Sequence, residues 1–80
     1  MTHQMIWRAI ERLAQSQGLS CSGLAKLSGL DSTTFNKSKR CDAYGKSRYP
    51  SFSTIAKVLN TSHMSMTEFG QICDRCRERE

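Results

Sequence analysis

The segment from Ser32 to Arg40 carries side chains whose chemistry suits contact with base edges. Projected at about 100° per residue, a helix over this segment has one face with neither acids nor apolar residues. That face consists of Ser32, Thr33, Asn36, Lys37 and Arg40. Asparagine can pair with adenine and arginine with guanine through two hydrogen bonds, and a hydroxyl can contact a base or a phosphate. An ordinary solvated face is the alternative, but such faces usually mix acids with bases.

Basic residues continue into the loop that follows this segment. They are Lys37, Lys39, Arg40, Lys46 and Arg48. Only Asp42 opposes them, and the hydroxyls of Tyr44 and Tyr49 lie among them. The whole chain has 12 Lys and Arg against 7 Asp and Glu, a net charge of +5, which favours polyanions because each neutralised phosphate releases counterions. The residues expected to contact phosphates are Lys39, Lys46, Arg48 and, at the start of a later helix, Ser51.

Helices are predicted to position all these residues within a single domain spanning 1–80, because 80 residues suffice for only one small core. Apolar residues recur at helical spacing, and Gly18, Ser20, Asp31, Ser51 and Ser65 are suited to helix ends. The expected helices end at Gly18, span 21–28 and 32–40, and begin after Ser51 and at Ser65, and the last few residues are expected to fray. The fold class is therefore all-α, a compact five-helix bundle.

The two helices over 21–28 and 32–40 match the requirements of a helix-turn-helix. Ala25 is small where the helices would cross, and Gly29 stands where the turn needs a positive φ. Leu24, Leu30 and Phe35 are expected to point inward and to fix the angle between the helices. An ordinary helical hairpin is the alternative. The base-contacting face of the second helix favours DNA binding.

The stretch from Cys21 to Phe35, with the helix start at Pro50-Ser51 and the following Ile55-Ala56-Lys57-Val58-Leu59, resembles the lambda-repressor/Cro (Xre) helix-turn-helix family. The run Thr34-Phe35-Asn36-Lys37-Ser38-Lys39-Arg40 is similar to phage-repressor-like regulators. The resemblance implies a lambda repressor-like domain whose third helix lies in the major groove, and a homodimer on a pseudo-palindromic operator. It also implies that Cys21 occupies a phosphate-contacting position, and that a C-terminal domain is present if the chain comes from a longer parent protein.

The last expected helix supplies the candidate dimer surface, formed by Phe69, Ile72 and Cys76. Cys73 and Cys76 have the spacing of half a zinc site, but structural zinc needs four ligands and the other cysteines and histidines are scattered. Packing is the simpler interpretation, with a thiol or zinc sensor as the alternative. No metal or cofactor is predicted.

The predicted function is therefore sequence-specific regulation of transcription, most simply as a repressor. The acids form no carboxylate pair, and neither a catalytic triad nor a glycine-rich phosphate loop is present, so we do not expect an enzyme. Without a signal sequence or a membrane-spanning run, a cytoplasmic location is expected. A protein-interaction module of the same fold, such as the antitoxin partner of a toxin, is the alternative.

Overall fold

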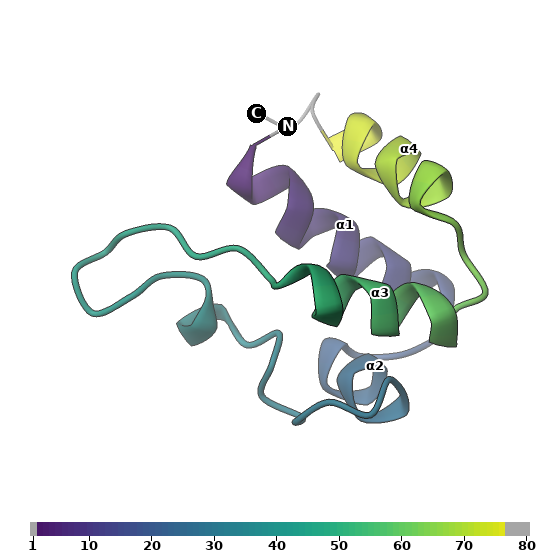
Figure 1. Cartoon of the computed structure of the whole chain (residues 1–80), viewed down its shortest axis with the longest axis horizontal. Coiled ribbons are helices and arrows are strands. Elements are labelled where there is room, and N and C mark those ends of the chain that lie inside the picture. The colour runs from purple at the N-terminus through teal and green to yellow at the C-terminus, as the bar shows by residue number, and fades with distance from the viewer. Residues whose placement is uncertain (1, 77–80) are drawn as a thin grey trace.

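Four α-helices enclose one core in the computed structural model, which describes residues 2–76 (Figure 1). They are α1 (His3–Ser16), α2 (Cys21–Leu27), α3 (Phe52–Thr61) and α4 (Met66–Cys76). Helix α1 packs against α2 and α4, and α2 packs against α3. The described chain is thus all-helical, as predicted. The expected fraying can be followed only to Cys76, where α4 ends, because residues 77–80 lie outside the described part.

The ends of these helices follow the expected capping chemistry. Ser20 Oγ accepts the Gly23 N–H at 3.0 Å, and Ser51 Oγ accepts that of Thr54 at 3.1 Å. Before α4, Ser65 Oγ accepts the Glu68 N–H while Glu68 Oε1 accepts the Ser65 N–H, both at 3.1 Å. Side chains thereby satisfy N–H groups that have no partner within the helix.

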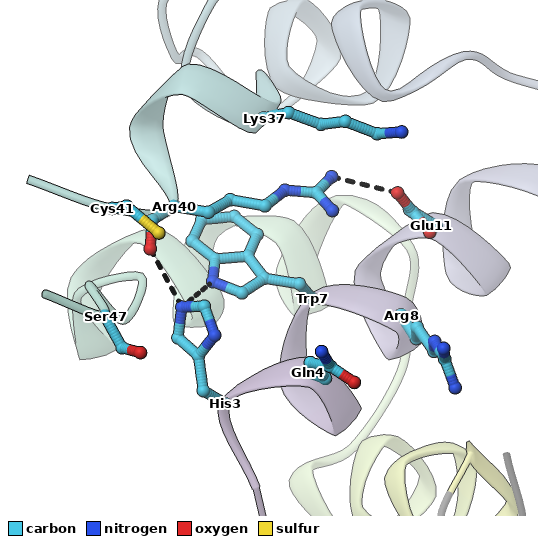
Figure 2. A pocket seen from close by; sticks show the side chains of 9 residues that line it. All are labelled: His3, Gln4, Trp7, Arg8, Glu11, Lys37, Arg40, Cys41 and Ser47. Carbon is cyan, nitrogen blue, oxygen red and sulfur yellow. Dashed lines mark hydrogen bonds and ion pairs between the residues drawn. The ribbon is translucent and has the colours of Figure 1, made fainter. Parts of the chain in front are cut away.

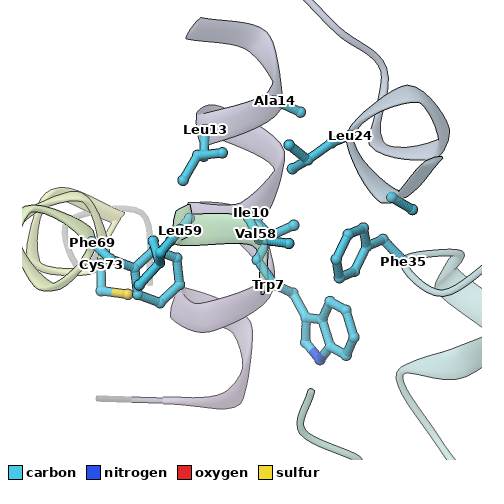
Figure 3. Close-up of a cluster of buried hydrophobic side chains, with 12 residues drawn as sticks. Trp7, Ile10, Leu13, Ala14, Leu24, Phe35, Val58, Leu59, Phe69 and Cys73 are labelled. Atoms are coloured by element: carbon cyan, nitrogen blue, oxygen red, sulfur yellow. The ribbon is translucent and has the colours of Figure 1, made fainter. Parts of the chain in front are cut away.

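The core lies between α1 and the other elements (Figure 3). Its large buried side chains include Trp7, Ile10, Leu13, Leu24, Phe35, Val58, Leu59 and Phe69. Leu27, although apolar, is 62% exposed. The face that α2 turns toward α1 follows Leu24, Ala25 and Ser28, which are all buried, and Leu27 lies beside it. No helix of the described chain is both long and apolar enough to cross a lipid bilayer.

The predicted third helix over 32–40 is wrong, and residues 2–76 contain four α-helices where five were expected. Successive turns occupy 32–35, followed by a 3-10 helix, η1 (Lys37–Lys39). Asp31 Oδ1 accepts the Thr33 N–H at 2.9 Å and the Thr33 hydroxyl at 2.7 Å, and Thr34 Oγ1 donates to the Asp31 carbonyl at 2.6 Å. Asp31 thus caps this segment as it would cap a helix, but Asn36 is extended, with φ −65° and ψ 149°, and ends the turns. Threonine and asparagine also favour helices weakly.

Gly29 adopts the expected positive φ, +75°, directly after α2. We expect Gly29→Ala to lower the free energy of unfolding by about 1–2 kcal/mol, because a Cβ is strained in this conformation. The added Cβ meets no atom within 4 Å, so the loss would come from the backbone alone. Gly70→Ala is the matched control in the open space of α4, and it should stabilise the protein by about 0.5–1 kcal/mol. Urea denaturation followed by circular dichroism measures both changes in the free energy of unfolding. Changes of the same sign in the two variants would contradict a backbone requirement for glycine at position 29.

Candidate nucleic-acid interface

Trp7 of α1 anchors the irregular chain between α2 and α3. Its ring is 3% exposed, and Nε1–H donates to the Arg48 carbonyl oxygen at 3.0 Å. The ring centroids of Trp7 and Phe35 are 6.4 Å apart in an edge-on arrangement. The ring therefore packs in the core. The partner of its N–H was missed, because Arg48 is 41 residues away along the chain.

His3 closes the base of the loop that runs from Arg40 to Arg48 (Figure 2). Its Nε2 lies 3.0 Å from the Arg40 carbonyl oxygen and 2.7 Å from that of Arg48. Both oxygens can only accept, so this nitrogen carries the hydrogen. The Trp7 indole nitrogen, also 3.0 Å from Nε2, therefore donates to Arg48 instead. The Arg48 N–H bonds to the Arg40 carbonyl at 2.8 Å, which joins the two sides of the loop.

Arg40 was predicted to contact a base, and the structure gives its guanidinium partners within the chain. Its Nη2 lies 2.9 Å from Glu11 Oε2, and its guanidinium carbon lies 5.0 Å from the centroid of the Trp7 ring (Figure 2). Nη2 also donates to the Phe35 carbonyl at 3.3 Å, and the Arg40 side chain is only 17% exposed. The ion pair and the cation–π contact commit this guanidinium to the fold. The sequence could not show it, because Glu11 is 29 residues away.

The other four base-contacting candidates remain at the surface, with Ser32 half-buried and Thr33, Asn36 and Lys37 exposed. They do not form one helical face, because turns replace the helix. Thr33 lines a hollow beside the start of α3, whereas Lys37 lines a second hollow with Arg40 and Glu11. The structure therefore divides Thr33 and Lys37 between two hollows, and Ser32 and Asn36 line neither of them.

The hollow beside α3 brings together three of the predicted phosphate contacts, Lys39, Arg48 and Ser51. It has a volume of about 400 Å³, and Thr33 and Tyr49 line it as well. All three predicted contacts are exposed. Ser51 caps α3, whose positive N-terminal dipole adds to the two basic side chains. The hollow can accept an anionic group of phosphate size.

Asp31 also lines this hollow and carries a negative charge there. The N–H and then the hydroxyl of Thr33 donate to its carboxylate, and both bonds lower the pKa of Asp31 below its ordinary value. The carboxylate therefore remains ionised at neutral pH. Lys39 and Arg48 outnumber it within the hollow, which keeps a net positive charge.

The remaining phosphate candidates lie elsewhere. Lys46 is exposed on the loop, and Cys21 is half-buried at the start of α2. Burial, followed by the nearby Glu11 carboxylate, raises the pKa of the Cys21 thiol. A neutral thiol beside a carboxylate offers little attraction to a phosphate.

The predicted dimer surface on α4 is also corrected. Phe69 is 4% exposed, Cys76 is fully buried, and Ile72 packs partly buried against the core. Cys73 is fully buried as well, and burial raises the pKa of its thiol above the ordinary value. The cysteines thus pack against the body of their own chain. Within residues 2–76, no three His, Cys, Asp or Glu side chains are grouped as metal ligands would be.

No known protein family matches the chain, and no curated protein or solved structure is detectably similar to it. Evidence for a function therefore comes from the geometry of residues 31–48, the segment that His3 and Trp7 anchor. His3, Glu11 and Asp42, which sequence reasoning did not select, organise that segment. The four-residue spacing of His3 and Trp7 at the start of α1 is the one sequence signal that could have indicated the first of them.

Proposed function

We propose that the chain is a sequence-specific DNA-binding regulator of transcription, most simply a repressor, whose contact surface is formed by residues 31–39 and the hollow beside α3. The observation that carries the proposal is the grouping of Lys39, Arg48 and Ser51 around that hollow, with Thr33 on its wall. Phosphate contacts fix the position of a protein on DNA, and neighbouring polar side chains then contact bases. Asn36 and Lys37 extend from the same segment and are exposed.

The anchoring of the segment supports this proposal. Phe35 is buried against Trp7, and Arg40 is paired with Glu11, so the backbone between them is fixed from both ends. Fixed polar groups bind with less loss of conformational entropy than groups on a free loop. The same ion pair neutralises Glu11, which would otherwise repel phosphates near this surface.

A homodimer on a two-fold operator remains part of the proposal. Its interface cannot be the inward side of α4, because Phe69 and Cys76 are buried within one chain. Sedimentation of the protein alone and with the selected duplex would measure the stoichiometry. One copy per operator would contradict the dimer without affecting DNA binding itself.

Selection of bound duplexes from a random pool, followed by fluorescence anisotropy, tests the proposed function. We expect Asn36→Ala to weaken binding to the selected duplex by about 1–3 kcal/mol and to relax the preference at one base pair. Asn60→Ala is the matched control, because Asn60 is exposed near the end of α3. An unchanged ranking of duplexes in Asn36→Ala would remove the base-contacting role of that residue. No enrichment at all with the natural chain would remove the proposed function.

A protein-interaction module, such as an antitoxin partner, is the second candidate function. Leu27 and Phe52 are 62% and 75% exposed, and exposed large apolar side chains are typical of surfaces that bind other proteins. The two candidates differ in their behaviour at low salt. A module that binds only protein would leave random duplex DNA unshifted in a gel, whereas the proposed regulator would retard it.

A further inference from the structure

We propose that residues 41–47 form a preorganised arm that contacts the DNA backbone beside the site bound by residues 31–39, and that Asp42 is the positioning residue of this arm. The inference rests on the proposed DNA-binding function and adds a second contact element to it. In Figure 1 the long teal loop between η1 and α3 extends well away from the four helices.

The tip of the arm is ordered by its own hydrogen bonds. Asp42 Oδ1 accepts the Tyr44 N–H at 2.8 Å and the Lys46 N–H at 2.9 Å. The Asp42 N–H donates to the Lys46 carbonyl at 2.9 Å, and Cys41 and Ser47 form an antiparallel bridge. Gly45 takes a φ of +77°, which permits the tight turn. The Asp42 carboxylate oxygen therefore orders the tip of the arm through bonds within the arm itself.

The base of the arm is fixed to α1. His3 contacts the carbonyl oxygens of both Arg40 and Arg48, and the Trp7 indole donates to the second of them. These are the residues on either side of the arm, so its two ends are held together over the N-terminal turn of α1. The arm is therefore ordered at the base and at the tip.

The exposed side chains of the arm match the chemistry of a phosphate backbone. Tyr44 is 95% exposed and contributes almost nothing to the core, and Lys46 is exposed beside it. The first offers a hydroxyl donor and the second an ammonium group, both of which commonly contact DNA phosphates. Asp42 is the acid of the arm, and the oxygen that bonds the two amides faces into the turn. Residues 41–47 have no net charge, because Lys46 balances Asp42. One Asp42 oxygen is bonded within the turn, whereas Lys46 is exposed, so the lysine is the charge that the arm offers to duplex DNA.

Two substitutions at Asp42 separate preorganisation from simple electrostatics. Asp42→Ala and Asp42→Asn each remove one negative charge, so charge alone predicts equally tighter binding for both. Asparagine keeps an oxygen that can accept the two amide hydrogens, whereas alanine does not. We therefore expect Asp42→Ala to bind the selected duplex about 3- to 10-fold more weakly than Asp42→Asn, because the loosened arm must be ordered on binding. Anisotropy titrations at one salt concentration measure this ratio.

Equal affinities of the two Asp42 variants would overturn the positioning role. Lys46→Gln provides a second measurement that does not depend on the turn, since its side chain is exposed. The slope of log K against log salt should decrease by about 0.9 if this lysine neutralises one phosphate. An unchanged slope would overturn contact between the arm and DNA. Failure of the natural chain to enrich any duplex would instead overturn the proposed function, so the two failures are distinguishable.

Discussion

Replacing Trp7 with alanine is expected to lower the free energy of unfolding by about 3–5 kcal/mol. The ring is buried, packs edge-on against Phe35 and supports the guanidinium of Arg40. Its loss leaves a cavity beside a half-buried charge, and both effects act in the same direction. Small domains have total stabilities of about 5–15 kcal/mol, so this variant should unfold at a much lower urea concentration. Far-UV circular dichroism is the appropriate signal, because Trp7 is the only tryptophan.

Trp7→Phe is the informative companion to that variant. It keeps an aromatic ring in the core but removes the N–H that donates to the Arg48 carbonyl. That carbonyl retains His3 as a donor at 2.7 Å, so it is not left without a partner. We expect a smaller loss, about 1–2 kcal/mol, from the missing hydrogen bond and the smaller ring. A loss below 1 kcal/mol in Trp7→Ala would contradict the anchoring role of this residue.

The elements that the sequence predicted correctly are those specified by local signals. Apolar spacing and capping serines located α1, α2, α3 and α4, and the positive φ of Gly29 follows from its place after α2. These features depend on residues within a few positions of one another. The error over 32–40 has a local cause as well, since Asp31 bonds to Thr33 as a helix cap would, but Asn36 takes an extended conformation that ends the turns. Asp31 is suited to a helix end, but the turn that it stabilises does not continue as an α-helix.

The long-range contacts of the candidate site had no sequence signal. Arg40 lies in a strongly basic run, so its charge alone predicted a nucleic-acid contact. Only the fold brings Glu11 to 2.9 Å from it and Trp7 beneath it. Similarly, the apolar stripe of α4 showed that one side of the helix is buried, but it could not distinguish the core from a partner subunit. The structure assigns Phe69 and Cys73 to the core.

Phe35 links the local turns to the long-range contacts of the site, because it is the buried residue of the irregular segment 31–50. It is 2% exposed and packs against Trp7 from the last position of the turns that precede η1. We expect Phe35→Ala to destabilise the protein by about 3–5 kcal/mol. Phe35→Leu, which keeps most of the volume, should cost less than about 1.5 kcal/mol. Urea denaturation gives both values.

DNA binding by Phe35→Ala separates a local role from a global one. Leu13→Ala is the matched control, because Leu13 is fully buried in α1 and its truncation should cost a comparable 2–5 kcal/mol. If residues 31–39 contact DNA, affinity per folded molecule should fall in Phe35→Ala and remain near the natural value in Leu13→Ala. The loss arises because the segment without its buried ring must be ordered again on each binding event. Equal affinities per folded molecule in the two variants would mean that loss of the Phe35 ring affects binding only through stability, and the contact surface would then have to lie outside this segment.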